Sequence, residues 1–429
     1  MTCERFHGPS RKCFCRSHRG FFRNRLSLIG VILIFALAGC ETTPKPVPPA
    51  APAPPEVVSL KKLSPSSYPN FADDLDYNSL GQAIAQSIAY LQVVPPQREV
   101  EFGRDRVSAA HILKSLQRFQ GFIQGRPTAR SLQDFIRDNY LVYQSPGRNA
   151  QDEVLFTGYY EPLLRGSRSR KPEYAYPVYP RPEDLVTVDL GAFSEKFKGE
   201  KITGRLDDRA LVPYYERREI EEDGVLYGKN QPIAWVNDPV DLFFLHIQGS
   251  GKIALDDGQT INAHYDGGNG RPYRSIGQLL IDEGKVSREE MSMQRIRAYL
   301  RENPHEIQRV LNHNPSYIFF KIGPGGALGA LNVRLTPGRS LALDRKIFPP
   351  AALTFIETKK PLGEASGKIK SWVDCRRFML NQDTGGAIVG PGRADIFWGE
   401  GPYAELAAGH LKHPGKLYFL VLKPEAGAP

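Results

Sequence analysis

Residues 383–399 read Asp-Thr-Gly-Gly-Ala-Ile-Val-Gly-Pro-Gly-Arg-Ala-Asp-Ile-Phe-Trp-Gly, and this stretch decides how the chain is interpreted. Four glycines and a proline lie between its two aspartates, Asp383 and Asp395. Glycine is entropically costly in a regular helix or strand, and proline donates no backbone hydrogen bond. We therefore expect a sharp turn that brings Asp383 back toward Asp395.

The second aspartate is followed by apolar and aromatic side chains, Ile396, Phe397 and Trp398. Apolar walls raise the pKa of a carboxyl group, which then stays protonated near neutral pH and can act as a general acid. The pattern favours a catalytic role for Asp395. The alternative is structural, because aspartates in glycine-rich turns commonly form Asx-turns or helix caps.

Residues 1–39 have the pattern of a secretory signal. Basic side chains between residues 11 and 25 precede an apolar run over 26–37, and Leu-Ala-Gly then leads directly into Cys40. The run is too short for a stable membrane span. The cysteine is placed as in bacterial lipoprotein signals, so we expect cleavage before Cys40 and lipidation of its thiol. An uncleaved anchor with an incidental cysteine is the alternative.

The signal changes how charge and cysteines are interpreted. It holds seven basic side chains and one acidic side chain, so most of the formal net charge of +9 leaves with it. The remaining chain is mildly basic, and we expect no nucleic-acid partner. With Cys40 lipidated, Cys375 has no partner for an intrachain disulfide. A packed core must therefore stabilise the body, which is long enough for two domains.

Residues 40–64 form a linker rich in proline and alanine. Seven prolines lie between residues 44 and 55. This composition favours extended polyproline II, a semi-rigid spacer of about 3 Å per residue. A disordered leader without a spacing role is the alternative.

The body mixes helical and strand patterns. Apolar periodicity and capping boxes predict helices over 104–122, 131–143 and 287–302, and another that starts at Asn303. The capping box of the third helix pairs Ser287 with Glu290. Strands are expected over 154–160, 242–248, 316–321, 352–358 and 417–422. The last hundred residues are mostly β with frequent glycine and proline, which favours a small barrel.

Motifs for other chemistries are absent or incomplete. The chain has no His-Glu-x-x-His, and its nine histidines are scattered, so we expect no metal site and no cofactor. Asp383-Thr384-Gly385 matches the aspartic-protease tripeptide. However, polar residues precede it and no second copy exists, so we do not favour a protease.

Three further segments are rich in aromatic and amide groups. They are Phe-Thr-Gly-Tyr-Tyr-Glu-Pro at 156–162, the run 238–251 that ends in His-Ile-Gln-Gly-Ser-Gly, and Asn-Pro-Ser-Tyr-Ile-Phe-Phe at 314–320. Aromatic faces with amides and hydroxyls suit sugar rings. Four phenylalanines are predicted to be core strand residues: Phe243, Phe244, Phe319 and Phe320. The candidates for binding lie at strand ends near glycines: Tyr159, Tyr160, Gln248 and Ser250.

These four segments, in this order behind a lipoprotein signal, resemble the membrane-bound lytic murein transglycosylase A family. The resemblance covers nearly all of the chain after the linker. It implies a mainly β, α+β fold, in which a double-psi β-barrel domain holds an inserted β-rich domain, with a groove between them. The barrel would comprise about residues 65–162 and 323–425, and the inserted domain about 163–322.

The resemblance also implies a reaction. Such enzymes cleave the β-1,4 bond between N-acetylmuramic acid and N-acetylglucosamine in peptidoglycan without water, and leave a 1,6-anhydro end. The family's single catalytic aspartate corresponds to Asp395, which would act first as acid and then as base. The expected substrate-binding residues are Thr157, Gly158, Tyr159, Tyr160, Gln248, Ser250, Asp383, Gly385 and Gly386. We expect a lytic exotransglycosylase, although no motif separates action at chain ends from internal cleavage.

The expected partners are peptidoglycan glycan strands and, through Cys40, a membrane. Glu41 after the lipidated cysteine differs from the inner-membrane retention aspartate of enteric bacteria, which favours the periplasmic face of the outer membrane. Proteins of cell-wall synthesis or division are further candidate partners. Two other functions stay open: a hydrolase on the same barrel that uses two aspartates and a water, and a non-catalytic lipoprotein that binds the wall.

Overall fold

The computed structural model describes residues 60–363 and 368–424. The predicted signal, Cys40 and most of the proline-rich linker lie outside the described residues, so these assignments remain predictions. Within the described ranges, no helix is both long and apolar enough to cross a membrane.

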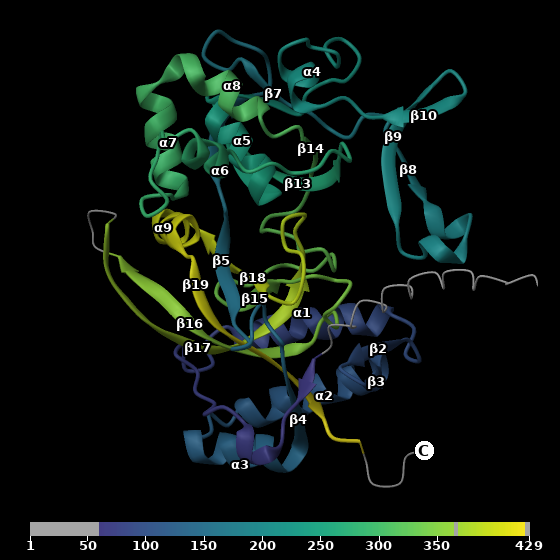
Figure 1. The fold of residues 1–429 in the computed structure, drawn as a ribbon, viewed down its shortest axis with the longest axis vertical. Helices are drawn as coiled ribbons and strands as arrows, with labels where there is room; N and C mark the ends of the chain where they lie inside the picture. The colour runs from purple at the N-terminus through teal and green to yellow at the C-terminus, as the bar shows by residue number, and fades with distance from the viewer. Residues whose placement is uncertain (1–59, 364–367, 425–429) are drawn as a thin grey trace, which may run out of the picture. The chain divides into compact units, whose positions relative to one another are not determined.

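The main sheet contains eight strands. Their order is β1 (Lys61–Lys62), β4 (Tyr140–Gln144), β19 (His413–Leu422), β16 (Leu353–Gly363), β17 (Ile369–Asp383), β15 (Ser340–Ala342), β18 (Arg393–Glu400) and β5 (Val154–Glu161). Strand β5 also pairs with β19, so the six strands from β19 to β5 close into a ring. Closure leaves the ring without a free edge, and β4 and β1 extend the sheet outward from β19. The expected barrel in the C-terminal part is therefore confirmed, and Figure 1 shows these strands crossing the middle of the molecule.

Helices and a hairpin pack on this barrel. They are α1 (Leu80–Val93), α2 (Ala109–Ile123), α3 (Ala129–Asn139), α9 (Pro402–His410) and the hairpin of β2 (Glu99–Phe102) and β3 (Asp105–Ser108). Helix α2 starts where Ser108 Oγ accepts a hydrogen bond from the His111 N–H, and its buried face includes Ile112, Leu116 and Phe119. The helix predicted over 104–122 therefore starts at Ala109, five residues later than predicted, because β3 occupies most of the preceding residues.

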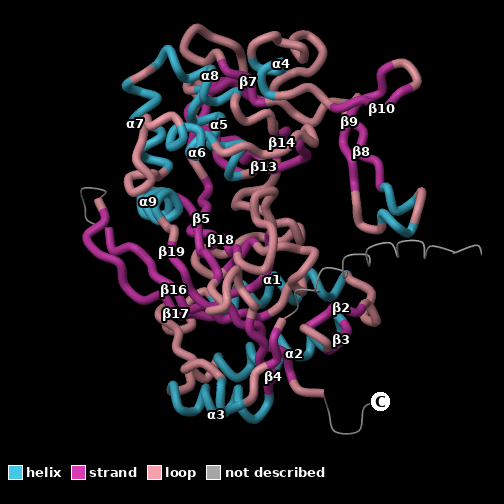
Figure 2. The backbone as a smooth tube through the Cα atoms, viewed as in Figure 1, coloured by secondary structure: helices cyan, strands magenta, loops and turns pink. Residues whose placement is uncertain are grey.

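A second sheet lies within residues 163–322. Its order is β14 (Ile318–Ile322), β13 (Thr260–Gly268), β12 (Ser250–Leu255), β6 (Leu163–Ser167), β11 (Ala234–Val236) and β7 (Tyr176–Val178). The helices of this region are α4 (Arg217–Glu221), α5 (Pro239–Gln248), α6 (Ile276–Asp282), α7 (Met293–Glu302) and α8 (Ile307–Asn312), and Figure 2 shows α5 to α8 gathered beside this sheet. A small third sheet contains β8 (Val186–Asp189), β9 (Lys201–Asp207) and β10 (Ala210–Pro213). Only Pro162 separates β5 of the barrel from β6 of the second sheet.

The strand predicted over 242–248 is wrong, because this segment is helix α5. Asp238 Oδ1 accepts hydrogen bonds from the N–H groups of Val240 and Asp241, and Pro239 occupies the first turn. Gly249 ends the helix with a φ of 78°. These two caps outweigh the strand preference of the aromatic run. Phe243 and Phe244 are nevertheless buried in the core, as predicted, on a helix instead of a strand.

Other predicted boundaries also need correction. The 131–143 helix ends at Asn139, and the Tyr-Leu-Val-Tyr run that follows forms β4. Ser287 and Glu290 do bond to each other, but they form a turn, and α7 starts at Met293 with Ser292 as its cap. The helix predicted to start at Asn303 is confirmed, because Asn303 directly precedes a 3-10 turn over Pro304–Glu306 that continues into α8. Its side-chain amide donates to Tyr299 O and makes no cap bond to that turn. The strands predicted over 154–160, 316–321, 352–358 and 417–422 are confirmed as β5, β14, β16 and β19.

Candidate active site

The two aspartates of the 383–399 stretch lie on strands that flank β15. Ala342 of β15 is the register partner of Asp383 on β17 in the parallel direction and of Asp395 on β18 in the antiparallel direction. Between these strands the chain turns, with Gly390 at a φ of 84°. The predicted turn that brings the two carboxyl groups together is confirmed.

The loop over 384–392 is held by side chains from outside it. Asp344 Oδ2 accepts a 2.8 Å hydrogen bond from the Gly390 N–H, and Ser145 Oγ donates to Pro391 O at 2.8 Å. Gly392 lies so close to Arg148 that an added Cβ would be 2.5 Å from the Arg148 Cβ. The sequence analysis did not single out Asp344, which directly follows the apolar run 341–343.

Asp395 has a partly enclosed carboxyl group. Thr157 on β5 donates its hydroxyl to Asp395 Oδ1, and the Arg393 Nη2 atom lies 3.6 Å from the same oxygen. Burial raises the pKa of Asp395, and the hydrogen bond from Thr157 and the charge of Arg393 oppose that rise. The side chain still keeps 19% of its surface exposed. It therefore combines a raised pKa, as predicted, with access for a ligand.

The apolar wall beside Asp395 differs from the one expected. Successive side chains alternate between the two faces of a strand. Phe397 is on the Asp395 face and packs on Tyr159 with ring centroids 5.2 Å apart. Ile396 and Trp398 belong to the main core on the opposite face. The prediction of an aromatic neighbour is thus right for Phe397 and wrong for Trp398.

Asp383 has its own hydrogen-bond donors. Tyr159 donates its hydroxyl to Asp383 Oδ2 at 2.8 Å, and the N–H groups of Ala330 and Thr384 donate to Oδ1 at 2.9 and 2.8 Å. Burial raises the pKa of Asp383 to about 6 in spite of these bonds. Burial and both aspartates raise the pKa of the Tyr159 phenol well above its usual range. The Tyr159 phenol therefore stays protonated. It donates a hydrogen bond to Asp383 and lies close enough to Asp395 to be affected by the charge of that carboxyl group.

The other predicted residues of β5 are divided between its two faces. Thr157 and Tyr159 share the face of Asp395. Gly158 faces the core, where an added Cβ would lie 2.6 Å from the Trp398 Nε1 atom. Tyr160 is 5% exposed and part of the main core, so it offers little surface to a ligand.

The remaining predicted residues lie at the end of α5 and in the 384–392 loop. Gln248 Oε1 accepts a 2.9 Å hydrogen bond from the Tyr160 N–H, which connects α5 to β5. Ser250 starts β12 and is buried. Gly386 is exposed, and Gly385 O accepts a hydrogen bond from the Ile388 N–H at 2.9 Å within the loop.

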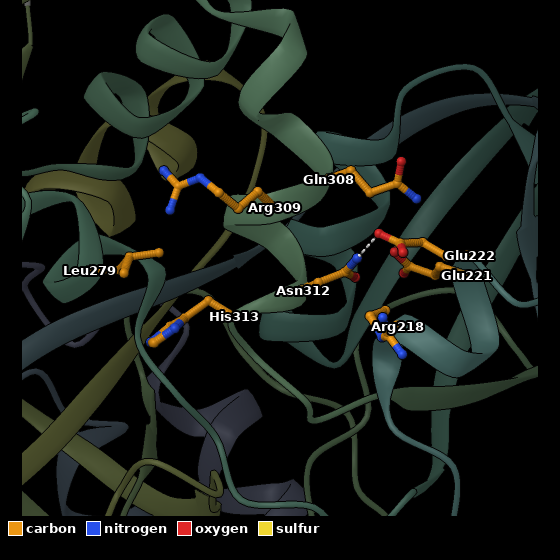
Figure 3. A pocket seen from close by; sticks show the side chains of 8 residues that line it. All are labelled: Arg218, Glu221, Glu222, Leu279, Gln308, Arg309, Asn312 and His313. Atoms are coloured by element: carbon orange, nitrogen blue, oxygen red, sulfur yellow. Dashed lines mark hydrogen bonds between the residues drawn. The ribbon is translucent and has the colours of Figure 1, made fainter.

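One hollow of the described surface lies away from these residues. A cavity of 810 Å³ between α4, α6 and α8 is shown in Figure 3. Its lining residues are Arg218, Glu221, Glu222, Leu279, Gln308, Arg309, Asn312 and His313, none of them a predicted site residue. Within residues 60–363 and 368–424, no group of three or more His, Cys, Asp or Glu side chains is arranged to hold a metal ion.

Comparisons with known proteins cover most of this chain. Residues 155–321 match the model of the MltA specific insert domain, and residues 339–421 match that of the 3D domain. Membrane-bound lytic murein transglycosylase A of Escherichia coli K12 is 34% identical over 311 residues, which are 72% of this chain and 76% of that protein. The protein of the same name from Vibrio cholerae is 32% identical over 65% of this chain and 68% of its own length.

Solved structures agree with these matches. A membrane-bound lytic murein transglycosylase from Agrobacterium tumefaciens has a TM-score of 0.69 at 32% identity, over 85% of this chain and 98% of that one. E. coli MltA with bound chitohexaose has a TM-score of 0.64 at 28% identity, over 86% of this chain and 96% of that one. The likeness confirms the predicted α+β fold class. The chain therefore belongs to the membrane-bound lytic murein transglycosylase A family.

Proposed function

We propose that this chain is a lytic transglycosylase that cleaves the β-1,4 bond between N-acetylmuramic acid and N-acetylglucosamine in peptidoglycan and leaves a 1,6-anhydro end. The names of its relatives and the chitohexaose bound to the E. coli structure support this substrate class. The observation that carries the proposal is the carboxyl group of Asp395, which is desolvated but reachable.

Asp395 performs both proton transfers in this proposal. Its protonated carboxyl group gives a proton to the glycosidic oxygen as the C1–O bond breaks. The carboxylate then takes the proton of the muramyl C6 hydroxyl as that oxygen bonds to C1. Since this attack is intramolecular, proximity replaces a second activating carboxylate. The raised pKa of Asp395 keeps the acid form available.

The glycan strand would lie in a groove between a barrel domain of residues 65–162 and 323–425 and an inserted domain of residues 163–322. Thr157 and Tyr159 share the Asp395 face, which supports their contact with sugar near the cleaved bond. Phe397 is buried and packs against Tyr159. Asp383, Gly385 and Gly386 would border the substrate from the 384–392 loop. Gln248 would support the substrate-facing strand β5 through its hydrogen bond to the Tyr160 N–H. Ser250 would contribute to substrate binding from the start of β12.

We place the protein at the periplasmic face of the outer membrane, anchored through lipidated Cys40. The sequence before residue 60 supports this location, and the relatives are named as membrane-bound. Labelling with a lipid precursor, with Cys40→Ser as the control, tests the anchor. Unlabelled parent protein would contradict it.

The muropeptides released from purified peptidoglycan test the reaction. The described residues from 60 onward belong to one compact unit, so a body that lacks the predicted signal and most of the linker is suitable. We expect products lighter than hydrolytic muropeptides by one water from the parent and none from Asp395→Asn. Asp374→Asn is a matched control, because Asp374 is an exposed residue of β17 paired with Lys359.

A two-aspartate hydrolase is the second candidate. The observation that favours it is Asp383, a carboxyl group with a pKa of about 6 across β15 from Asp395. This function requires water to reach the cleaved bond and gives reducing ends. If the parent releases products with reducing ends and Asp383→Asn does not, the chain is a two-aspartate hydrolase and our proposal is wrong. If the protein binds purified peptidoglycan but releases no muropeptides, it is a non-catalytic lipoprotein that binds the wall.

A further inference from the structure

Arg393 begins β18, two residues before Asp395, so both side chains lie on the same face of the strand. Its Nη2 atom is 3.2 Å from Thr157 Oγ1 and 3.6 Å from Asp395 Oδ1. Thr157 comes from β5, where it is the register partner of Asp395. Arg393, Thr157 and Asp395 thus form one short chain of contacts across two parallel strands.

The direction of these hydrogen bonds follows from the donors available. Arg393 can only donate, and a threonine hydroxyl has one proton. When Thr157 accepts from Arg393, its proton is directed at Asp395 Oδ1. Oδ1 is therefore occupied by a hydrogen bond, and Oδ2 remains as the oxygen that carries an exchangeable proton.

We propose that Arg393 is a positioning residue that works through Thr157 to select Oδ2 of Asp395 as the proton-carrying oxygen and to hold the carboxylate formed when that proton leaves. This assignment rests on the proposed function. In the first step the Oδ2–H bond breaks and its proton passes to the glycosidic oxygen. In the second step Oδ2 regains a proton from the C6 hydroxyl, so the site ends as it began.

The charged surroundings single out Arg393. The β5 strand contributes Thr157 and the neutral phenol of Tyr159, and β17 contributes Asp383. The β15 partner of Asp395 is Ala342, which has no charge. Tyr273, just before α6, also feels the charge of Arg393. Among the described residues, Arg393 is the cation whose charge opposes the desolvation of Asp395.

The test compares Arg393→Gln and Arg393→Lys with the control Arg130→Gln in the pH dependence of kcat and KM on purified peptidoglycan. Arg130 is an exposed residue of α3 and has no role in the proposed site. A nearby cation lowers the pKa of a carboxyl group, so Arg393→Gln should keep Asp395 protonated to a higher pH. We expect the alkaline limb of its pH–kcat profile to move to higher pH by about one unit. Its kcat should fall on the order of tenfold with KM little changed, whereas Arg393→Lys keeps the limb near that of the parent.

The assignment would be overturned if the alkaline limb of the pH–kcat profile of folded Arg393→Gln coincides with the limbs of the parent and of Arg130→Gln. A Thr157→Val background tests whether Arg393 acts through Thr157. If it does, Arg393→Gln should lower kcat by a smaller factor in this background than in the parent. An equal cost in both backgrounds would contradict action through Thr157.

If Arg393→Gln fails to fold, Thr157→Val and Thr157→Ser carry the test. A kcat loss in Thr157→Val that Thr157→Ser restores supports action through Thr157, and full activity of Thr157→Val overturns it. Active Asp395→Asn would instead refute the proposed function. Inactive Asp395→Asn with an unmoved limb in Arg393→Gln would refute the role of Arg393 alone.

Discussion

Two of the clusters of enclosed polar groups in the described residues differ in their access to solvent, one in the barrel and one beside the second sheet. In the barrel cluster, Asp395 keeps 19% of its side chain exposed. The second-sheet cluster consists of Arg217, His246 and Tyr317, which are 0%, 4% and 0% exposed. Burial lowers the pKa of His246 and raises that of Tyr317 far from their usual values. A shifted pKa therefore accompanies both clusters, and access to solvent separates a catalytic candidate from a structural centre.

The bonds of the second-sheet cluster support its structural role. Arg217 donates to Asn314 O at 3.1 Å, to Ser316 O at 2.7 Å and to Glu221 Oε1 at 2.6 Å. His246 Nδ1 lies 3.0 Å from Arg217 Nη1. These contacts join α4, α5 and the segment before β14. We expect changes here to affect stability, whereas changes at Asp395 should affect turnover.

The largest expected effect is that of Asp395→Asn on activity. Asn cannot donate the proton or accept it back, so turnover should fall by about 10⁴-fold or more. The amide oxygen can still accept from Thr157, so the melting temperature should stay close to that of the parent. Release of anhydro-muropeptides and thermal unfolding measure the two quantities. Residual activity within tenfold of the parent would refute the contrast between the clusters.

Arg217→Ala should show the opposite pattern. It leaves Glu221 without its buried partner, and we expect the free energy of unfolding to fall by about 3–5 kcal/mol. Arg218→Ala is the matched control, because Arg218 is 58% exposed and should change stability by about 0.5 kcal/mol or less. Denaturant unfolding gives both values. A stable Arg217→Ala protein that lacks activity would assign a functional role to this cluster.

Gly158→Ala tests the face of β5 opposite the catalytic candidate. Its Cβ would lie 2.6 Å from Trp398 Nε1 and 3.1 Å from the Ala408 Cα. Such overpacking costs about 1–3 kcal/mol. Gly121→Ala in α2 is the control, since its Cβ meets nothing within 4 Å and alanine favours a helix. If thermal unfolding ranks both variants alike, the packing of Trp398 on Gly158 is not as described.

Asp383→Asn should produce the smallest change, and it depends on pH. The folded pKa of about 6 lies above the ordinary value of 3.8, so the contribution of Asp383 to stability is greatest below pH 4 and is lost as pH rises through 6. The amide carries no charge to desolvate. At pH 7 the variant should therefore be more stable than the parent by about 1–2 kcal/mol, and at pH 4 the two should be nearly equal. Unfolding between pH 4 and 7 measures this, and a pH-independent difference would contradict the raised pKa.

Local chemistry explains which features the sequence could predict. The turn between Asp383 and Asp395 was predictable because glycine and proline restrict the chain where they stand. Strands β5, β16 and β19 were predictable from their apolar composition. The same reasoning failed at α5, where Phe243 and Phe244 suggest a strand but Asp238 and Gly249 cap a helix.

Partners far apart in the sequence could not be predicted in this way. Arg393 and Thr157 are 236 residues apart, and Tyr159 and Asp383 are 224 residues apart. Their contacts exist only because β5 and β18 are neighbours in the ring. The orientation of Trp398 away from Asp395 was predictable in principle from strand alternation, once β18 was recognised as a strand.

The ring of the barrel also has a consequence for biosynthesis. It closes where His413 on β19 pairs with Phe156 on β5, two residues that lie more than 250 positions apart in the sequence. The second sheet, by contrast, is complete once residue 322 has been made. A chain still being synthesised can therefore complete its second sheet before Asp395 has met Thr157. Because this contact needs β18, we expect the site around Asp395 to stay incomplete, and so inactive, until the chain has been made beyond that strand.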